Sequence, residues 1–314
     1  MKGLFARRSR REPGWLAVSV QPSALSFAHG VGGAPGNCSI TRCGSRALDG
    51  TPNDLERVAK ELGAESYQCM TVLPATDYQL LLVDAPNVPA LELKTAMRWR
   101  VKDMLDYHVE DATIDVLDIP VDAAGGGRNH SMYVVAARND IIQGCIERFT
   151  EAHMPLTVID IAETAQRNIA ALYEPPNRGV GLLYLGQAQA LLTITFHGEL
   201  YLARRIDVGA DQILAATGAA RDELMNRIVL ELQRSFDHLD RQFPFVALSK
   251  LVLAPEPGDT GLAAHLKANL GVAVEQAELG QVISFAPGVA LDGNAAWRLF
   301  HVIGAALRHE AKAL

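Results

Sequence analysis

The chain opens with short apolar runs separated by turn residues, a pattern typical of β-strands. Prolines and glycines bound the first run, and a glycine-rich turn is expected at 30–36. The apolar runs in this region predict strands at 15–20, 25–28, 38–43, 68–73 and 79–83. A helix is predicted at 51–62, with Thr51 as its N-cap, because apolar residues recur there at helical spacing.

Helical periodicity becomes stronger after residue 88. Leu93, Met97, Val101 and Met104 recur at spacings of four, four and three, which predicts a helix at 89–105. Asn139 is expected to cap a further helix that runs to about residue 153. The other elements predicted before residue 174 are strands at 114–119, 132–138 and 157–161 and a helix at 163–173.

The pattern then restarts after a Pro-rich segment at 174–179, which indicates a boundary between two halves. Both halves begin with strand, turn, strand and strand, and both continue with alternating helices and strands. The predicted elements of the second half are strands at 180–185, 191–196, 200–206, 251–253 and 272–275 and helices at 211–216, 221–243, 262–270 and 295–312. The sequence therefore predicts a duplicated α/β fold with a central cleft.

Composition fits a folded protein of two domains or one large domain. The 314 residues are 49% hydrophobic and 21% charged, and the formal net charge of −7 argues against a nucleic-acid binder. Four cysteines exclude a disulfide scaffold and fit a reducing compartment as buried free thiols. Cys38 and Cys43 lie an odd number of residues apart on one predicted strand, so they are expected to face opposite sides.

Two segments bear on membrane contact. Residues 1–13 are expected to form a disordered basic tail, since five Lys or Arg residues fall within the first eleven, and such a tail would either stay in solvent or weakly contact an anionic membrane surface. No apolar run follows, so this tail is not a signal peptide. The uncharged stretch 179–196 is interrupted at 186–189, which favours two buried strands over a membrane span.

Common catalytic and metal-binding motifs are missing from the sequence. It contains no P-loop, no nucleophile elbow and no zinc-protease motif. Gly125–Gly127 is best interpreted as a hairpin tip, and the nine histidines lack metal-ligand spacing. On the longest predicted helix, Glu231 and Arg234 either form ordinary surface ion pairs, such as Arg234 with Asp237 or His238, or face a cleft between the halves.

Five segments in sequence order resemble the PilM family of type IV pilus assembly proteins. Within that family they are most similar to MshI, the version found in mannose-sensitive haemagglutinin (MSHA) pilus systems, and the cytoplasmic domain of GspL is a more distant relative. The resemblance covers about residues 14–312. Five segments of the sequence carry the resemblance. The first is Leu73-Pro74 together with the helix at 89–105, and the second is 132–138. The others are the segment from 183–186 through 198–205 together with Gly209, then 231–237, and finally 303–308.

The resemblance implies the actin-like ATPase fold, as in FtsA. The first half would be 14–176, with an inserted small α/β subdomain at about 37–155, and the second half would be 177–314. Members of this fold hold ATP between the halves, on two strand-turn-strand loops whose glycines let the backbone approach the phosphates and whose aspartates hold Mg²⁺.

The sequence departs from that loop pattern. Ser19 and Gln21 stand where the first loop would have its acid and its glycine, and Pro22 removes an N–H donor. In the second loop Gly186 is kept, but Tyr184 replaces the acid, and the late adenosine loop reads Leu253-Ala254-Pro255-Glu256. We therefore expect a degenerate nucleotide cleft with no catalytic residue and no metal ligand. Its expected members are Ser19, Gln21, Gly186, Gln187, Gly209 and Glu231.

Three functions follow as alternatives. The first is a non-catalytic scaffold peripheral to the cytoplasmic face of the inner membrane, which binds the N-terminal cytoplasmic peptide of a bitopic PilN-like protein in a groove between the first-half core and its insertion. Self-association and the basic tail on the membrane would add contacts, and no cofactor is expected. The second is an ATP-binding switch or weak ATPase that holds Mg²⁺-ATP with low affinity. The third is a sugar kinase, whose acid would have to be Asp207 or Asp211, both expected to face solvent.

Overall fold

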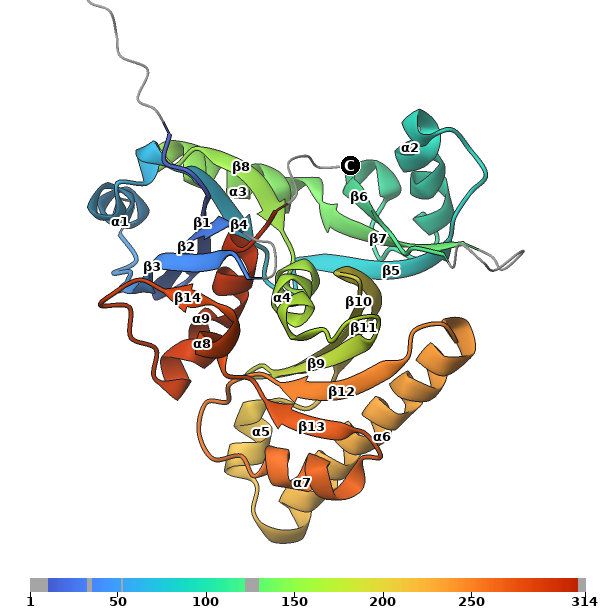
Figure 1. Ribbon diagram of the computed structural model, residues 1–314. Helices are drawn as coiled ribbons and strands as arrows, with labels where there is room; N and C mark the ends of the chain where they lie inside the picture. The colour runs from blue at the N-terminus through green and yellow to red at the C-terminus, as the bar shows by residue number, and fades with distance from the viewer. Residues whose placement is uncertain (1–10, 33–35, 52, 122–129, 310–314) are drawn as a thin grey trace, which may run out of the picture.

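The computed structural model describes residues 11–32, 36–51, 53–121 and 130–309. Three β-sheets organise this part of the chain (Figure 1). Most of the predicted basic tail and the predicted Gly125–Gly127 hairpin tip lie outside the described residues. The duplicated α/β fold expected from the sequence is confirmed.

The first half is built on a six-stranded sheet with the order β14-β3-β2-β1-β4-β8. Alternating residues of β1 divide between its faces: Leu16 and Val18 pack with α1 and α3, whereas Ala17 packs with α4 and α9. The strands are β1 (Trp15–Gln21), β2 (Ala24–Gly32), β3 (Cys38–Ala47), β4 (Gln68–Val72), β8 (Leu156–Asp160) and β14 (Ser284–Phe285). The helices are α1 (Asp54–Leu62), α3 (Asn139–Glu151), α4 (Ala162–Ala170) and α9 (Gly293–Ala306).

A β-bulge corrects two expectations about this sheet. Strand β2 continues through Gly32, so the start of the predicted 30–36 turn is strand. Opposite it, His29 pairs with Arg42 and Gly30 pairs with Ile40, which leaves Thr41 as the extra residue. The extra residue reverses the alternation along β3, so Cys38 and Cys43 contact the same core instead of opposite faces.

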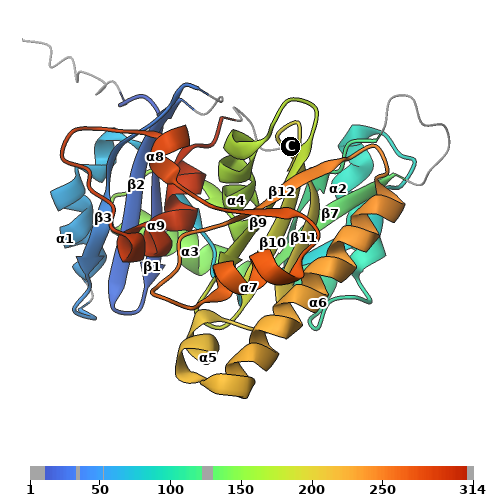
Figure 2. The same cartoon turned by 60° about the horizontal axis from the view of Figure 1, so that its bottom comes forward.

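The second half repeats the plan on a five-stranded sheet with the order β11-β10-β9-β12-β13. Its three-strand meander and its longest helix fall close to the predicted ranges. The elements are β9 (Gly179–Leu185), β10 (Ala190–Phe196), β11 (Glu199–Ile206), α5 (Ala210–Ala215), α6 (Gly218–Gln242), β12 (Leu248–Leu253), α7 (Leu262–Asn269) and β13 (Ala273–Gln276). Helices α6 and α7 pack on one face of the sheet, and Figure 2 shows α6 running beneath it.

A three-stranded antiparallel sheet, in the order β5-β7-β6, forms the insertion. It comprises β5 (Tyr78–Asp84), α2 (Ala90–Val101), β6 (Ala112–Asp118) and β7 (Ser131–Arg138). We expected the insertion at about 37–155, but β3 and β4 belong to the six-stranded sheet, which places the inserted sheet at Tyr78–Arg138. Helix α2 buries Met97 and Val101, as predicted, but ends there and leaves Met104 47% exposed.

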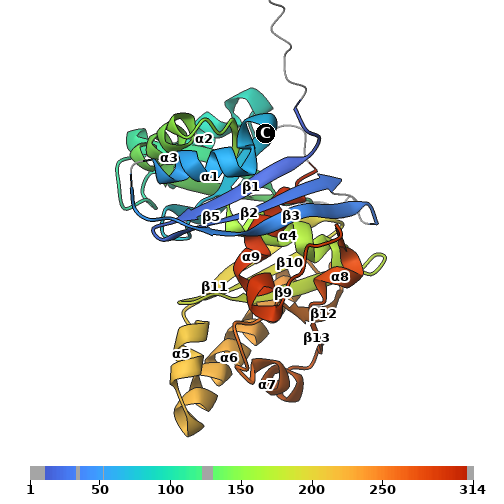
Figure 3. The ribbon, with the colours of Figure 1, turned by 90° about the vertical axis from the view of Figure 1, so that its left-hand side faces the viewer.

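Helices α4 and α9 form a layer between the two large sheets (Figure 3). They cross closely: a Cβ at Gly304 would lie 2.1 Å from the carbonyl oxygen of Ala165, and Asn168 Nδ2 donates to the Gly304 carbonyl at 3.0 Å. Glycine at this position therefore sets the spacing of the layer.

The last part of the described chain returns to the first half, where β14 pairs with β3. Helix α8 (Leu279–Val282) and β14 were not predicted, because four and two residues are too short to show a period.

Local capping corrects two further predictions. The N-cap of α1 is Asn53 rather than Thr51; the Thr51 hydroxyl instead donates to the Asp54 carboxylate at 3.3 Å. The N-cap of α3 is Arg138, and Asn139 already lies in the helix. The uncharged stretch 179–196 forms β9 and β10, as predicted. Among the described helices, none combines the length and hydropathy that a membrane crossing requires.

Candidate functional site

The first predicted loop lies at the end of β1. Ser19 and Gln21 follow Ala17 at intervals of two, so all three belong to the face of β1 that is turned toward α4 and α9. Ser19 is partly buried and Gln21 is exposed. The first loop expected in the nucleotide cleft therefore lies on this face of the sheet.

The second predicted loop, the β9–β10 turn, is packed onto the start of α5. The Ala210 N–H donates to the Gly186 carbonyl at 2.8 Å, and the Asp211 N–H donates to the Gln187 carbonyl at 3.1 Å. A Cβ at Gly209 would lie 2.1 Å from the Gln187 oxygen. Gly186, Gln187 and Gly209 thus come together as predicted, but the first N–H groups of α5 are already paired with the protein's own carbonyls.

Aromatic side chains fill the space beside this turn. Tyr184 stacks on Phe300 with ring centroids 5.3 Å apart and meets His301 edge-on at 4.4 Å. Its hydroxyl donates to the Trp297 carbonyl at 3.3 Å, and Trp297 Nε1 donates to the Leu185 carbonyl at 2.7 Å. Burial raises the pKa of Tyr184, so this side chain is neutral at the position where the resemblance implies an acid. We call Tyr184, Trp297, Phe300 and His301 the aromatic cluster.

His301 is held neutral within the aromatic cluster. Its Nε2 lies 3.4 Å from Gln166 Oε1, whose side-chain amide donates to the Leu182 carbonyl at 2.8 Å. The Gln166 oxygen therefore accepts a hydrogen bond from the imidazole Nε2–H. Burial lowers the pKa of His301 to about 4, because a charged imidazolium would lose its hydration.

This pKa predicts acid sensitivity. The unfolded chain binds a proton at His301 below about pH 6.5, whereas the folded protein binds it only near pH 4, so folding stability falls as the pH drops through this window. The His301→Gln variant should lose up to roughly 1.4 kcal/mol per pH unit of that dependence. Urea unfolding of both proteins from pH 4 to 7.5 measures it; parallel profiles for the two proteins would contradict the assignment.

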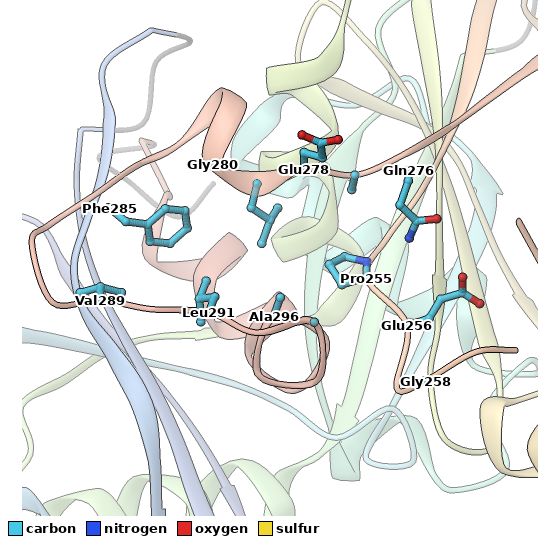
Figure 4. A pocket seen from close by; sticks show the side chains of 13 residues that line it. Pro255, Glu256, Gly258, Gln276, Glu278, Gly280, Phe285, Val289, Leu291 and Ala296 are labelled. Atoms are coloured by element: carbon cyan, nitrogen blue, oxygen red, sulfur yellow. The ribbon is translucent and has the colours of Figure 1, made fainter.

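The predicted adenosine loop borders a pocket of about 520 Å³ at the carboxyl ends of β12 and β13. In Figure 4 the side chains of Pro255, Glu256 and Gln276 lie on one side and those of Phe285 and Leu291 on the other. The Thr260 hydroxyl donates to Glu256, and burial raises the pKa of the Glu256 carboxyl. No lysine, arginine or histidine is among the described residues that line the pocket, so it offers no cationic side chain to a phosphate.

The remaining candidates lie elsewhere. Glu231 accepts from Arg234 Nη1 at 2.7 Å and lies 3.5 Å from Arg204 Nε, on the side of α6 that faces β11. It does not join the loops, and the ion pair expected between Arg234 and Asp237 or His238 is replaced by the one with Glu231. Asp207 and Asp211 are exposed, as predicted. Within the described ranges, no cluster of His, Cys, Asp or Glu residues could hold a metal ion.

A groove lies between the six-stranded sheet and α3, beside the segment that leads into the insertion. It has a volume of about 240 Å³ and is bordered by the end of β1, the segment entering β5 and α3. Apolar side chains line it, and Asp77, Asp140 and Arg148 add charge. A Cβ at Gly144 of α3 would meet no atom within 4 Å. We call this the junction groove; it is lined by Val20, Thr71–Pro74, Asp77, Asp140, Ile141, Gly144, Cys145, Arg148 and Phe149.

Comparison with solved structures identifies the architecture. The PilM-PilN type IV pilus biogenesis complex matches with a TM-score of 0.68 and 20% identity, over 95% of this chain and 97% of that one. A Bacteroides thetaiotaomicron protein described as having an actin-like ATPase fold and unknown function matches with a TM-score of 0.50 and 11% identity, over 88% and 94%. The chain has the actin-like ATPase fold.

A further solved structure is similar at a lower TM-score. The actin-like chain also matches the cytoplasmic domain of EpsL, an inner-membrane component of the Vibrio cholerae type II secretion system, with a TM-score of 0.49 and 14% identity over 93% and 94% of the two chains. Neither a protein-family model nor a curated protein matches the sequence. The similarity to PilM that the sequence suggested is therefore confirmed in the fold and spans nearly the whole of both chains.

Proposed function

We propose that this actin-like protein is a non-catalytic scaffold of a type IV pilus assembly machinery of the MSHA kind. It would lie at the cytoplasmic face of the inner membrane and bind the N-terminal cytoplasmic peptide of a PilN-like protein. The observation that carries the proposal is the likeness in fold to PilM, which was solved in complex with PilN. The absence of catalysis in this proposal is supported by the α5 N–H groups, which are paired with carbonyl oxygens of the β9–β10 turn.

The junction groove is the proposed seat of the peptide. It lies between the six-stranded sheet and α3, next to the segment that leads into the inserted sheet, and apolar residues such as Leu73, Ile141 and Phe149 line it. Asp77, Asp140 and Arg148 all lie at this groove, and Arg138 pairs with Asp140 at 2.9 Å, so apolar contact rather than charge would hold the peptide. A short peptide with apolar side chains therefore fits the groove.

Gly144 offers a direct test, because a side chain there enters open space. Gly144→Leu should fill the groove and weaken the peptide at least about tenfold, while the helix itself gains up to about 1 kcal/mol. Gly144→Ala, which adds one methyl group, is the matched control. The measurement is fluorescence anisotropy with the labelled N-terminal peptide of the PilN-like protein from the same genome. Equal affinity for Gly144→Leu and Gly144→Ala would refute this seat.

If the protein is a non-catalytic scaffold with a degenerate cleft, we expect that it does not bind ATP. Tyr184 replaces an acid that would hold Mg²⁺, and the N–H groups of α5 that could meet a phosphate are occupied. Calorimetry with excess Mg²⁺ and ATP should show no binding heat, and the nucleotide should not raise the unfolding temperature. A dissociation constant in the micromolar range or below would overturn this prediction and favour an ATP-binding switch.

A further inference from the structure

A second groove lies between the inserted sheet and the second half of the molecule. Its volume is about 410 Å³. Leu82 of β5 and Tyr133 of β7 contribute to its floor, and three arginines, Arg204 of β11 with Arg234 and Arg241 of α6, surround it. We call this the basic groove. It shares no lining residue with the junction groove, which lies between the six-stranded sheet and α3.

The floor of the basic groove is a partly covered sheet face. Leu82 and Tyr133 are cross-strand partners, so their side chains lie on the same face. At the covered end, the Ala203 N–H donates to the Tyr133 hydroxyl at 3.0 Å and ties β11 to the inserted sheet. At the open end, Leu82 is 47% exposed. An apolar side chain could therefore be buried on this floor.

Arg204 and Arg234 give the groove a surplus of positive charge. They share one carboxylate, Glu231, at 3.5 and 2.7 Å, and their side chains remain 42% and 60% exposed. Arg241 also lines the groove. His238 stays neutral, because burial and the charges of Arg241 and Arg204 lower its pKa. On a chain with a formal charge of −7, this surplus is a local exception.

We propose that the basic groove binds a short acidic segment of a partner protein. Its apolar side chains would pack on Leu82 and Tyr133, and its carboxylates would pair with Arg204 and Arg234. A bare phosphate would leave the apolar floor unused. A bilayer surface is flat, whereas the groove is recessed between a sheet face and a helix.

The test uses fluorescence anisotropy with labelled octapeptides. A peptide that alternates Leu and Glu should bind at low salt at least about tenfold more tightly than peptides that alternate Leu with Lys or Ser with Glu. Its affinity should fall as salt screens the charges. The double variant Arg234→Glu/Arg241→Glu should weaken the Leu-Glu peptide at least about tenfold, and Leu82→Ser should weaken it without changing the charge. Arg227→Glu, on the same helix but outside the groove, is the matched control and should bind normally.

Several results would overturn the proposal. Absence of binding would do so, as would binding that is the same in the Arg227→Glu and Arg234→Glu/Arg241→Glu proteins. Two further measurements cover other occupants: flotation with phosphatidylglycerol vesicles and sedimentation of the protein alone. If the groove variant removes vesicle binding or dissociates a dimer but leaves peptide binding unchanged, the occupant is a membrane or a second copy. Loss of peptide binding here with intact binding in the junction groove leaves the proposed scaffold function standing.

Discussion

Replacing Glu163 by alanine is expected to lower the free energy of unfolding by about 3–5 kcal/mol, because it leaves a partly buried arginine without its partner. Glu163 is 1% exposed and accepts from Arg205 Nη2 at 3.0 Å and Nε at 3.2 Å. The Tyr78 hydroxyl also donates to Glu163 and accepts from the Ala162 N–H at 3.2 Å. The Arg205 guanidinium lies 4.6 Å from the centre of the Tyr78 ring.

The expected loss is large because this cluster joins three parts of the fold. Tyr78 begins the inserted sheet, Glu163 belongs to α4 and Arg205 to the edge strand β11 of the second half. Urea unfolding of Glu163→Ala gives the free energy. Glu56→Ala is the matched control, since Glu56 pairs with Lys60 at 2.6 Å on the exposed side of α1, where a pair contributes about 0.5 kcal/mol or less. Similar losses in the two variants would show that the cluster adds nothing beyond a surface pair.

Trp297→Ala is expected to destabilise the protein by a comparable amount, about 3–5 kcal/mol. Trp297 is 8% exposed and stacks on Tyr184 with centroids 6.4 Å apart. The change would leave a cavity within the aromatic cluster and would remove the donor that Leu185 accepts from at 2.7 Å. The same unfolding measurement applies.

The matched control for this change is Trp99→Ala. Trp99 lies on α2 and is 61% exposed, so its removal should change stability by about 0.5 kcal/mol or less. Binding of Mg²⁺-ATP to Trp297→Ala should be measured as well. If the aromatic cluster were the sole obstacle to nucleotide binding, this variant would gain affinity for Mg²⁺-ATP. We expect no gain in affinity, because the α5 N–H groups stay paired with carbonyl oxygens of the protein. A stability loss no greater than that of Trp99→Ala would contradict the role given to the cluster.

The duplicated fold could be predicted because its signals are local. Apolar runs of strand length, the helical spacing of Met97 and Val101 and the restart after 174–179 each lie within a short window of sequence. Features that depend on contacts between elements could not be predicted from the sequence as well. The bulge at Thr41 depends on how β3 pairs with β2, and it reversed the expected direction of Cys43. The limits of the insertion depended on which sheet β3 and β4 would join.

The candidate site shows the same division. The loop residues Gly186, Gln187 and Gly209 could be located from the sequence, and their part in a degenerate nucleotide cleft stays a prediction. The aromatic cluster could not be found, because Tyr184 and Trp297 are 113 positions apart and no spacing rule joins a strand to a helix at that range. For Glu231 the sequence left two alternatives, a surface ion pair or a place in the cleft, because helical periodicity predicts which residues share a face but not which element packs against that face.

The return of the chain to its first half has a consequence for how the protein is made. The six-stranded sheet is complete only when β14 pairs with β3, and its inner face is covered by α9, residues Gly293–Ala306. A ribosome adds about 5–20 residues per second, so the first strands emerge many seconds before their cover. During that interval the side chains of Ala17, Ala28 and Met70 are not yet covered by α9. A nascent chain arrested before residue 293 should therefore remain sensitive to protease. Release of α9 from the ribosome would then be the step after which the six-stranded sheet can reach its native state.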